Sequence, residues 1–500
     1  MGTIRRQSIQ GTLILVSGVL LALVLRLIIF TKFLDEEQIG LLAVLLDAAN
    51  LFAAFIPLGS QSIFIKYLPY FRNEQGKPRG LLFTGLSLTA LGLSIFLLTY
   101  FLFQDKLVNF YSDKAPLLSQ YFFYLLPLVI VRVIYVVGQS YSQALKKNIF
   151  PLIIKEILVR ILTALLVLGF AGNWFDFDGL VFWYVFIYFI SGSIMTGYLA
   201  QLRQLDLRPQ RGKLSGSFGR QIFSFGFFTL LYSGGAMLTR NVDTIMIATF
   251  SNLGTEDNLK ATGIYTIAFL IGMIIELPRR AISQITTPFI ADAMAKNRLD
   301  QIAVLYHKSS INQFLAGALL FILVWTNLDS LYALMPKGEI YRSGVWVVFF
   351  IGLSKLFDMS MGVNSQIIQN SQYYKFNTYS MVLLATLAVG SNVVLIPLYG
   401  INGAAIASFI SLSLINIIRS AYIKSRLDLQ PFRFNSVIAL IIGGASWLLA
   451  YFLPEFMNPY LDIIYRGLIT TFVFSILVLA TGVSEDLNEF ANDVRKRLRV

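Results

Sequence analysis

The stretch MLTRNVDTIMIATF, residues 237–250, places an arginine and an aspartate inside a long apolar segment. The whole segment, residues 218–250, exceeds the roughly 20 apolar residues that a helix needs to cross about 30 Å of hydrocarbon. Similar segments recur along the 500-residue chain, of which 56% is hydrophobic and only 13% is charged. Soluble domains carry about 25% charged residues. The sequence therefore predicts an all-α, polytopic membrane protein.

Fourteen apolar segments are separated by short polar turns or by turns that contain Pro and Gly. PLYGING at 397–403 is such a turn, in which Pro397 and two glycines end one helix and begin the next. We therefore predict 14 transmembrane helices. They are roughly residues 9–33, 39–66, 79–103, 117–145, 150–171, 179–203, 218–250, 261–291, 304–328, 341–364, 374–398, 401–424, 434–454 and 461–482.

Basic residues gather in alternate loops, such as KYLPYFRNEQGKPR at 66–79 and RQLDLRPQRGK at 203–213, whereas DEEQ and GTED in the other loops are acidic. Lys and Arg favour the cytoplasmic side of a membrane. The pattern predicts that both termini are cytoplasmic and that residues 484–500 form an amphipathic helix on the inner surface. Loop charge also explains the net charge of +13, so no nucleic-acid partner is expected.

The cysteine and histidine content limits which metal sites and covalent cross-links the chain can form. The chain has no cysteine and a single histidine, His307, which we expect at the surface or the membrane interface. Disulfides, thiolate metal sites and zinc sites of several histidines are excluded by this composition. The sequence therefore predicts no cofactor, apart from a coupling ion.

The chain contains a weak internal repeat at an offset of 223–226 residues. Gly40 and Gly263 each open a predicted span, and QALKKNIF at 143–150 aligns with QNSQYYKF at 369–376. Six spans separate the two copies, so both have the same orientation in the membrane. We predict two pseudo-symmetric six-helix lobes and an added segment. These are residues 1–213, residues 214–428, and residues 429–500 with helices 13 and 14 and the cytoplasmic tail.

Ionisable side chains within spans are costly and usually face protein or water. Arg132 and Arg160 fall near mid-depth on neighbouring predicted helices, where no acidic residue of the first lobe is expected. Either backbone carbonyls and water satisfy them, or they bind a phosphate, which guanidinium groups grip with bidentate geometry. Arg26 either pairs with Asp47 or joins them in a substrate-binding site.

A second group of polar residues lies in the second lobe. Asp243, Asn392 and Ser408 fall at similar predicted depth, and their oxygens would suit Na⁺, although Asp243 has the alternative of bridging to Arg240 on its own helix. Glu276, mid-span, is a second candidate for carrying a proton. We therefore expect an acidic second lobe opposite a basic first lobe.

Two further charged pairs have simpler interpretations. Lys155 and Glu156 fall near the inner face, where they would snorkel or pair. Lys355 and Asp358 are spaced i, i+3, which favours a bridge along one helix. Neither pair is assigned a functional role.

Three stretches give the chain a family resemblance. IPLGSQSIFIKYLPYF at 56–71, TRNVDTIMIA at 239–248 followed by GIYTIAF, and NVVLIPLYGINGAAIASFIS at 392–411 resemble polysaccharide-biosynthesis flippases. These belong to the multidrug/oligosaccharidyl-lipid/polysaccharide exporter superfamily. The resemblance implies the two-lobe, MATE-like bundle of multidrug exporters, working by alternating access. It implies an undecaprenyl-pyrophosphate-linked oligosaccharide as the substrate, moved to the outer leaflet of the bacterial cytoplasmic membrane.

The resemblance also bears on the coupling ion. Lipid II flippases of this superfamily have a sodium site on helices 7, 11 and 12, and Asp243, Asn392 and Ser408 match those positions by motif. A second acidic ligand is expected where this chain has Ile396. The coupling ion, Na⁺ or H⁺, therefore stays open, as does coupling to the membrane potential.

Three functional alternatives follow. The first is the flippase, with lipid-linked oligosaccharide and membrane lipid as partners, and with a glycan polymerase or export machinery beside it. The second is a multidrug or cation antiporter of the same fold, for which an acidic cavity would be expected. The third is a membrane polymerase or glycosyltransferase, which the short outer loops disfavour. We therefore predict that the protein is a transporter rather than an enzyme.

Overall fold

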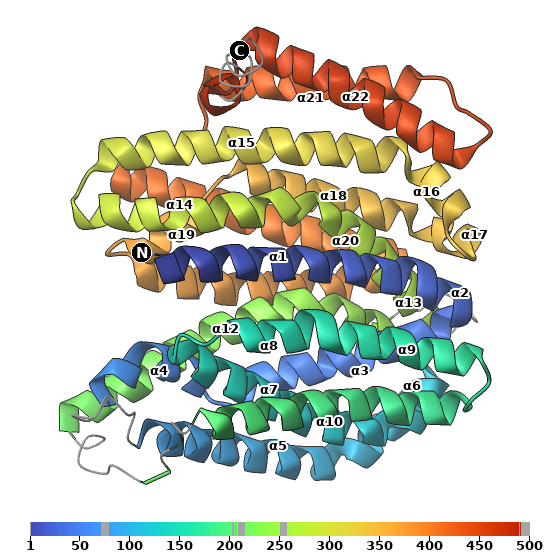
Figure 1. The fold of residues 1–500 in the computed structure, drawn as a ribbon, viewed down its shortest axis with the longest axis vertical. Coiled ribbons are helices and arrows are strands. Elements are labelled where there is room, and N and C mark those ends of the chain that lie inside the picture. The colour runs from blue at the N-terminus through green and yellow to red at the C-terminus, as the bar shows by residue number, and fades with distance from the viewer. Residues whose placement is uncertain are drawn as a thin grey trace. The chain divides into compact units, whose positions relative to one another are not determined.

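The computed structural model describes residues 2–71, 80–202, 205, 207–208, 216–250, 258–489 and 491. Every regular element in these ranges is a helix, and twelve of the helices are long and apolar enough to cross a membrane. This confirms the predicted all-α membrane fold (Figure 1). The predicted tail helix falls largely on residues outside the described ranges.

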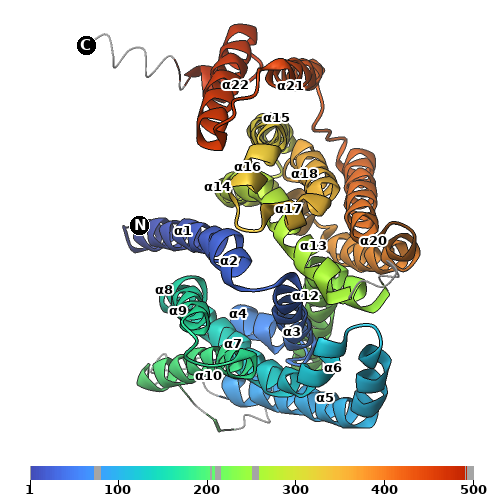
Figure 2. The same ribbon diagram turned by 90° about the vertical axis from the view of Figure 1, so that its right-hand side faces the viewer.

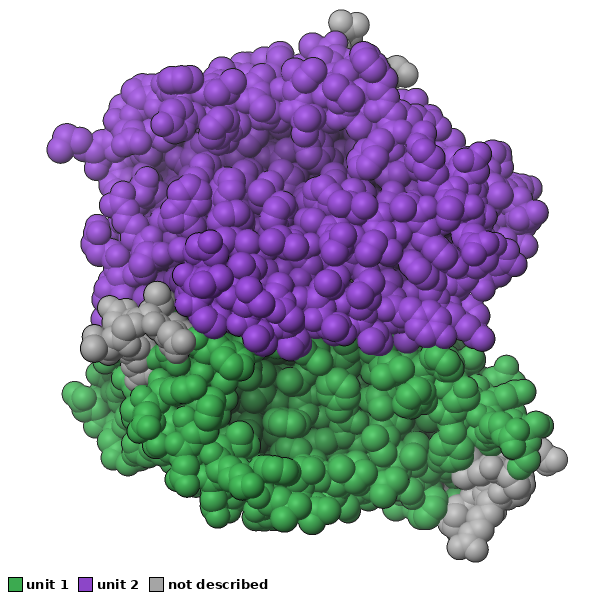
Figure 3. Space-filling view, turned by 180° about the vertical axis from the view of Figure 1, so that it is seen from behind, with its two compact units in different colours: residues 1–263 green, residues 264–500 purple. Residues whose placement is uncertain are grey.

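The chain divides into two compact units, residues 1–263 and 264–500, coloured separately in Figure 3. In unit 1, α3 packs against α7 and α12, and α7 also packs against α4 and α10. The helices of unit 1 are α1 Gly2–Val24, η1 Leu25–Phe30, α2 Thr31–Phe33, α3 Glu36–Phe55, α4 Ser60–Tyr67, η2 Leu68–Phe71, α5 Leu81–Ser112, α6 Pro116–Tyr121, η3 Phe122–Tyr124, α7 Leu125–Ala144, α8 Ile149–Ile153, η4 Ile154–Leu158, α9 Val159–Ala171, α10 Phe177–Gln201 and α12 Gly216–Phe250.

The boundary between the units falls within α13, Asn258–Met273. In unit 2, α18 packs against α15 and α20, and α14 packs against α15. The remaining helices are η5 Ile274–Glu276, α14 Leu277–Ala295, α15 Leu299–Thr326, α16 Leu328–Leu334, α17 Gly338–Tyr341, η6 Arg342–Gly344, α18 Val345–Ser360, α19 Asn364–Asn370, α20 Tyr374–Leu427, α21 Phe434–Phe452 and α22 Pro459–Thr481. The predicted three-part division of the chain stays a prediction.

Two segments explain why twelve helices qualify where fourteen were predicted. The 54 residues of α20 would extend about 80 Å as one straight helix, but Gly400 has non-helical angles (φ 56°, ψ −133°) and breaks it. The continuous helix 149–171 carries three charged residues, Lys155, Glu156 and Arg160. The turn predicted at 397–403 thus coincides with a break, whereas the number of fourteen stays a prediction.

Local sequence signals fix several helix ends. Asp176 accepts a hydrogen bond from the Gly179 amide at the start of α10, and Asn458 accepts bonds from the first amides of α22. Such caps satisfy amides that have no partner within the helix. Gly482 follows α22 with φ 64°, a conformation that glycine adopts without strain.

Two glycines at equivalent repeat positions allow backbone contact between α3 and α13. A Cβ atom on Gly40 would lie 2.0 Å from the carbonyl oxygen of Leu259, and one on Gly263 would lie 2.0 Å from that of Glu36. Glu36 and Gly40 correspond to Leu259 and Gly263 at a single offset of 223 residues. Gly40 thus contacts Leu259, the equivalent of Glu36, while Gly263, the equivalent of Gly40, contacts Glu36 itself. Such reciprocal contacts are expected when two equivalent segments are related by a two-fold axis.

The α21–α22 hairpin packs along α15 within unit 2 (Figure 2). Buried apolar side chains of α15, α21 and α22 form one cluster, which includes Leu315, Ile442 and Phe474. On α15, Lys308 lies 3.0 Å from both Glu485 and Asp486. His307 is buried and its Nδ1 lies 2.8 Å from the Pro431 carbonyl oxygen. The expectation of a solvated His307 is therefore wrong, whereas its position at the membrane interface stays a prediction.

The backbone contact at Gly40 gives a stability prediction. Gly40→Ala should lower the thermal denaturation midpoint of the purified protein, because a backbone carbonyl cannot yield to the new methyl group. Overpacking of this kind costs about 1–3 kcal/mol.

Gly197→Ala on α10 is the matched control, since nothing lies within 4 Å of its Cβ position. It should leave the midpoint unchanged or raise it. Equal midpoints for both variants would contradict the proposed contact.

Candidate functional site

Two π-helical segments of unit 1 carry charged residues. The α1 helix continues into η1, which carries Arg26, and α8 continues into η4, which carries Lys155 and Glu156. The α1 helix packs against η4, and η1 packs against α9. A π-helix changes the direction of side chains within an otherwise regular helix and is frequent at functional sites. The sequence pattern gave no signal of either segment.

Arg160 on α9 forms a close ion pair with Glu156. The Arg160 Nη2–Glu156 Oε2 distance is 2.6 Å, and Lys155 Nζ lies 3.6 Å from Glu156 Oε1. The Glu156 side chain is 8% exposed and that of Arg160 is 24% exposed. The prediction that no carboxylate accompanies Arg160 is wrong, because residues four apart on a helix are neighbours whatever their estimated depth.

Gly18 on α1 makes room for this ion pair. A Cβ atom there would lie 2.6 Å from Arg160 Nη1 and 2.8 Å from Glu156 Cβ. The α1 helix can therefore cover the Arg160–Glu156 pair at backbone distance. A role for Gly18 could not be read from sequence, because the chain has 36 glycines.

Arg132 on α7 has a different environment. Its Nε donates a hydrogen bond to Asn50 Oδ1 at 2.9 Å, and its guanidinium lies 5.7 Å and 5.6 Å from the ring centroids of Tyr135 and Tyr188. It is 9% exposed, and within the described ranges no carboxylate oxygen lies within 4.0 Å of it. Aromatic rings and one amide thus surround this buried cation.

Arg26 belongs to the same region. It interacts electrostatically with the Asp47 carboxylate. Arg26 also interacts electrostatically with Arg160. Arg26 therefore acts electrostatically on both Asp47 and Arg160, so the two sequence interpretations of Arg26 both stay predictions.

These residues form what we call the cationic cluster of unit 1. Lys155 interacts electrostatically with Arg132, Arg160 and Arg240 as well as with Glu156. The cluster has five basic side chains and two carboxylates, namely Arg26, Arg132, Lys155, Arg160 and Arg240 with Asp47 and Glu156. Such an excess of positive charge among membrane-spanning helices favours an anionic ligand, and guanidinium groups suit phosphate.

The three residues predicted to bind a cation lie in different units. Asp243 is on α12 in unit 1 and is 4% exposed, whereas Asn392 and Ser408 are on α20 in unit 2, with Asn392 fully buried. Among the described residues, no three His, Asp or Glu side chains gather in a metal-ligating group. The sodium or proton site at Asp243, Asn392 and Ser408 stays a prediction.

Glu276 lies at the centre of an ion-pair network in unit 2. Lys355 Nζ lies 3.1 Å from its Oε2, and Arg279 and Arg280 lie 3.5 Å and 3.7 Å from its Oε1. Arg279 also lies 3.0 Å from Asp358. Sequence reasoning missed Arg279, although its i, i+3 spacing from Glu276 was a signal. These contacts describe Glu276 as an ion-pair partner, and its role as a proton carrier stays untested.

The network corrects two expectations. Lys355 pairs with Glu276, and Asp358 pairs with Arg279 and accepts a hydrogen bond from Asn416 at 2.9 Å. The predicted Lys355–Asp358 bridge along α18 is therefore wrong, because neighbouring helices supply closer partners. The prediction of an acidic second lobe is wrong for this network too, since its basic side chains outnumber its carboxylates.

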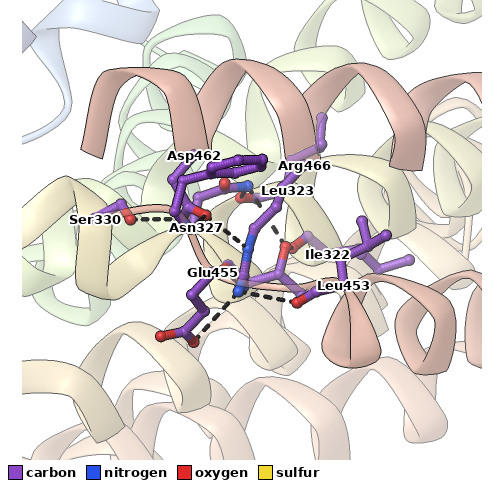
Figure 4. Close-up of polar contacts among 10 residues, drawn as sticks. Ile322, Leu323, Asn327, Ser330, Leu453, Glu455, Asp462 and Arg466 are labelled. Carbon is purple, nitrogen blue, oxygen red and sulfur yellow. Dashed lines mark hydrogen bonds and ion pairs between the residues drawn. The ribbon is translucent and has the colours of Figure 1, made fainter. Parts of the chain in front are cut away.

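A second set of charges, absent from our sequence candidates, surrounds Arg466 on α22 (Figure 4). Its Nε lies 3.1 Å from Asp462, and its Nη2 lies 3.3 Å from Glu455. Its Nη1 donates to the Thr326 carbonyl and its Nη2 to the Leu453 carbonyl. One buried guanidinium thus joins α22 to the ends of α15 and α21. The i, i+4 spacing of Asp462 and Arg466 was the available sequence signal.

Removal of Arg466 should destabilise unit 2. Arg466→Met leaves the Asp462 carboxylate buried without its cation, and breaking a buried pair in this way costs about 3–5 kcal/mol. The thermal denaturation midpoint in detergent should fall accordingly.

Asp462→Asn added to Arg466→Met should recover part of the loss. It removes the unpaired charge and keeps an oxygen for the Phe456 amide, which donates to Asp462 at 3.0 Å. An Arg466→Met protein as stable as the wild type would refute the role of this contact.

Comparisons with known proteins agree with this architecture. The family model "Polysaccharide biosynthesis protein" matches residues 8–294. No curated protein sequence matches the chain.

Similar solved structures include "Lipid II flippase MurJ, inward closed conformation", with a TM-score of 0.73 and 10% identity over 95% of this chain and 99% of that chain. Another is the inward-facing conformation of a multidrug resistance MATE family transporter of the MOP superfamily, with a TM-score of 0.64 and 16% identity over 82% of this chain and 94% of the other. At these identities the likeness concerns the fold, which is that of MOP-superfamily flippases and transporters.

Proposed function

Because the chain belongs to the polysaccharide biosynthesis protein family, we propose that it flips an undecaprenyl-pyrophosphate-linked oligosaccharide from the inner to the outer leaflet of the bacterial cytoplasmic membrane. Its fold is that of flippases and transporters, which are not enzymes. We therefore propose that the chain is a transporter and not an enzyme, and we assign it no catalytic residue. Turnover proceeds by alternating access and is driven by a cation gradient or by the membrane potential.

The cationic cluster of unit 1 is the observation that supports the proposal. A pyrophosphate group cannot cross hydrocarbon without compensating charge and hydrogen bonds. Arg132 and Arg160, with Arg26 beside them, would bind the phosphate oxygens, because planar guanidinium groups bind phosphate in bidentate geometry. The polyprenyl chain would stay in the surrounding lipid.

The rival function is export of cationic drugs by the same fold. A site for cations is expected to hold an excess of carboxylates, whereas the cationic cluster holds five basic side chains and two acidic ones. The charge of the site therefore favours an anionic substrate. A membrane glycosyltransferase or polymerase is disfavoured by the family and the fold, and such an enzyme would instead be a partner.

The distribution of basic loops favours an inner-membrane protein with both termini in the cytoplasm. With this orientation the substrate enters from the leaflet where lipid-linked sugars are assembled. A periplasmic polymerase or export complex would then receive it.

The anion role is tested by removing two guanidinium groups. Arg132→Ala combined with Arg160→Ala should reduce surface glycan export at least about tenfold, because each charged hydrogen bond lost contributes about 1.5–3 kcal/mol. Export is measured as surface glycan in a strain that lacks the wild-type gene, together with the amount of protein in the membrane.

The matched control is Lys296→Ala with Arg298→Ala, which removes the same charge from two exposed positions. It should export normally. Normal export by the Arg132/Arg160 variant at normal membrane abundance would rule out the anion site.

The coupling ion is tested at Asp243. Asp243→Asn should abolish the dependence of transport on a Na⁺ or H⁺ gradient in vesicles, because the amide cannot neutralise the ion. Asp292→Asn, at a side chain 61% exposed, is the control. Unchanged ion dependence in Asp243→Asn would count against coupling at this residue.

A further inference from the structure

Only one of the two terminal nitrogens of the Arg160 guanidinium has a partner among the described residues. Its Nη2 is held by Glu156 at 2.6 Å, whereas its buried Nη1 has no hydrogen-bond partner among the described residues. The side chain is 24% exposed. Buried donors are rarely left without an acceptor, so Nη1 has capacity for one further oxygen.

Arg466 in unit 2 gives a comparison, because its guanidinium has more oxygen neighbours and less exposure than that of Arg160. Each of its three nitrogens lies within 3.3 Å of an oxygen atom, and its side chain is 6% exposed. Arg160 combines a close ion pair with a side chain that is more exposed than that of Arg466, 24% against 6%.

Glu156 has a second cation within reach. Lys155 Nζ lies 3.6 Å from Oε1, whereas Arg160 is bound through Oε2. A buried carboxylate that loses its partner entirely is strongly destabilised. With Lys155 beside it, Glu156 can release Arg160 and still remain paired.

We propose that Glu156 is a built-in counter-anion, which holds Arg160 in the empty protein and is displaced by the phosphate of the substrate. This inference rests on the proposed function. Phosphate and Glu156 compete for one guanidinium group, so Glu156 lowers the affinity of the site for anions. A transport site must bind its substrate well enough to admit it and weakly enough to release it. By competing for Arg160, Glu156 keeps the phosphate affinity of the site low enough for release.

The test measures binding of inorganic pyrophosphate to the purified full-length protein by isothermal titration calorimetry. Glu156→Gln removes the competing charge, and pyrophosphate should bind about tenfold more tightly, which corresponds to the lower range for one charged hydrogen bond. Dissociation should slow in proportion, and glycan export should fall, because the site releases its ligand too slowly.

Glu485→Gln is the matched control, because it makes the same change in net charge at a side chain 74% exposed. It should bind pyrophosphate as the wild type does. Tighter binding by both variants would show a general charge effect and would overturn the assignment to Glu156.

A double variant tests whether the effect passes through Arg160. In an Arg160→Ala background, Glu156→Gln should leave pyrophosphate affinity unchanged, because the guanidinium for which Glu156 and pyrophosphate compete is absent. An equal gain in affinity in both backgrounds would overturn the proposal.

The conservative variant Glu156→Asp keeps the charge but withdraws the carboxylate by one methylene group. Its affinity should lie between those of the wild type and Glu156→Gln. It also serves if Glu156→Gln does not fold, and wild-type affinity in Glu156→Asp would then overturn the proposal.

The two proposals fail in different ways. If Arg132→Ala with Arg160→Ala binds pyrophosphate as the wild type does, the anion site itself is absent. If that variant loses binding while Glu156→Gln binds as the wild type does, only the counter-anion role is wrong.

Discussion

A charge inside a membrane-spanning bundle must be neutralised by a partner, by water or by a ligand, since an exposed charge at mid-membrane costs about 2.5–3.5 kcal/mol on insertion scales. In unit 2 the protein supplies the partners itself: Arg466 is enclosed by oxygens, and Arg279 lies between two carboxylates. In unit 1, by contrast, Arg132 contacts an amide and aromatic rings, with no carboxylate within 4.0 Å among the described residues. The same constraint that joins helices in unit 2 therefore argues for an anionic ligand in unit 1.

The two copies of the predicted repeat share a backbone contact, whereas their charged residues differ. Gly40 and Gly263 make reciprocal contacts at one offset, because only glycine lets two helix backbones approach so closely. Arg132 and Asp358 lie 226 residues apart, within the offset range of the predicted repeat, yet one contacts an amide and aromatic rings and the other an arginine and an amide. The predicted repeat is therefore seen in this backbone contact and not in the charged residues.

Much of the fold could be predicted from hydrophobic segments and turn residues, and little of the site. Segment length and composition indicated the membrane helices, and Pro397 with Gly400 indicated the break in α20. Charges were assigned by depth along separate helices, which misjudged Arg160 and missed Arg466. Depth says nothing of which side of a helix a residue faces, and partners four residues apart or on a neighbouring helix decide whether a charge is satisfied.

By itself the sequence determined that the chain is a bundle of membrane-spanning helices with basic residues among them, because apolar length and charge spacing are properties of the chain alone. The tertiary structure decided which charges are matched. Glu156 pairs with Arg160, Glu276 pairs with Lys355, and several oxygen atoms lie around Arg466. Arg132 instead lies beside an amide and two aromatic rings. Pairing depends on distance and direction across helices, and those exist only once the helices have packed.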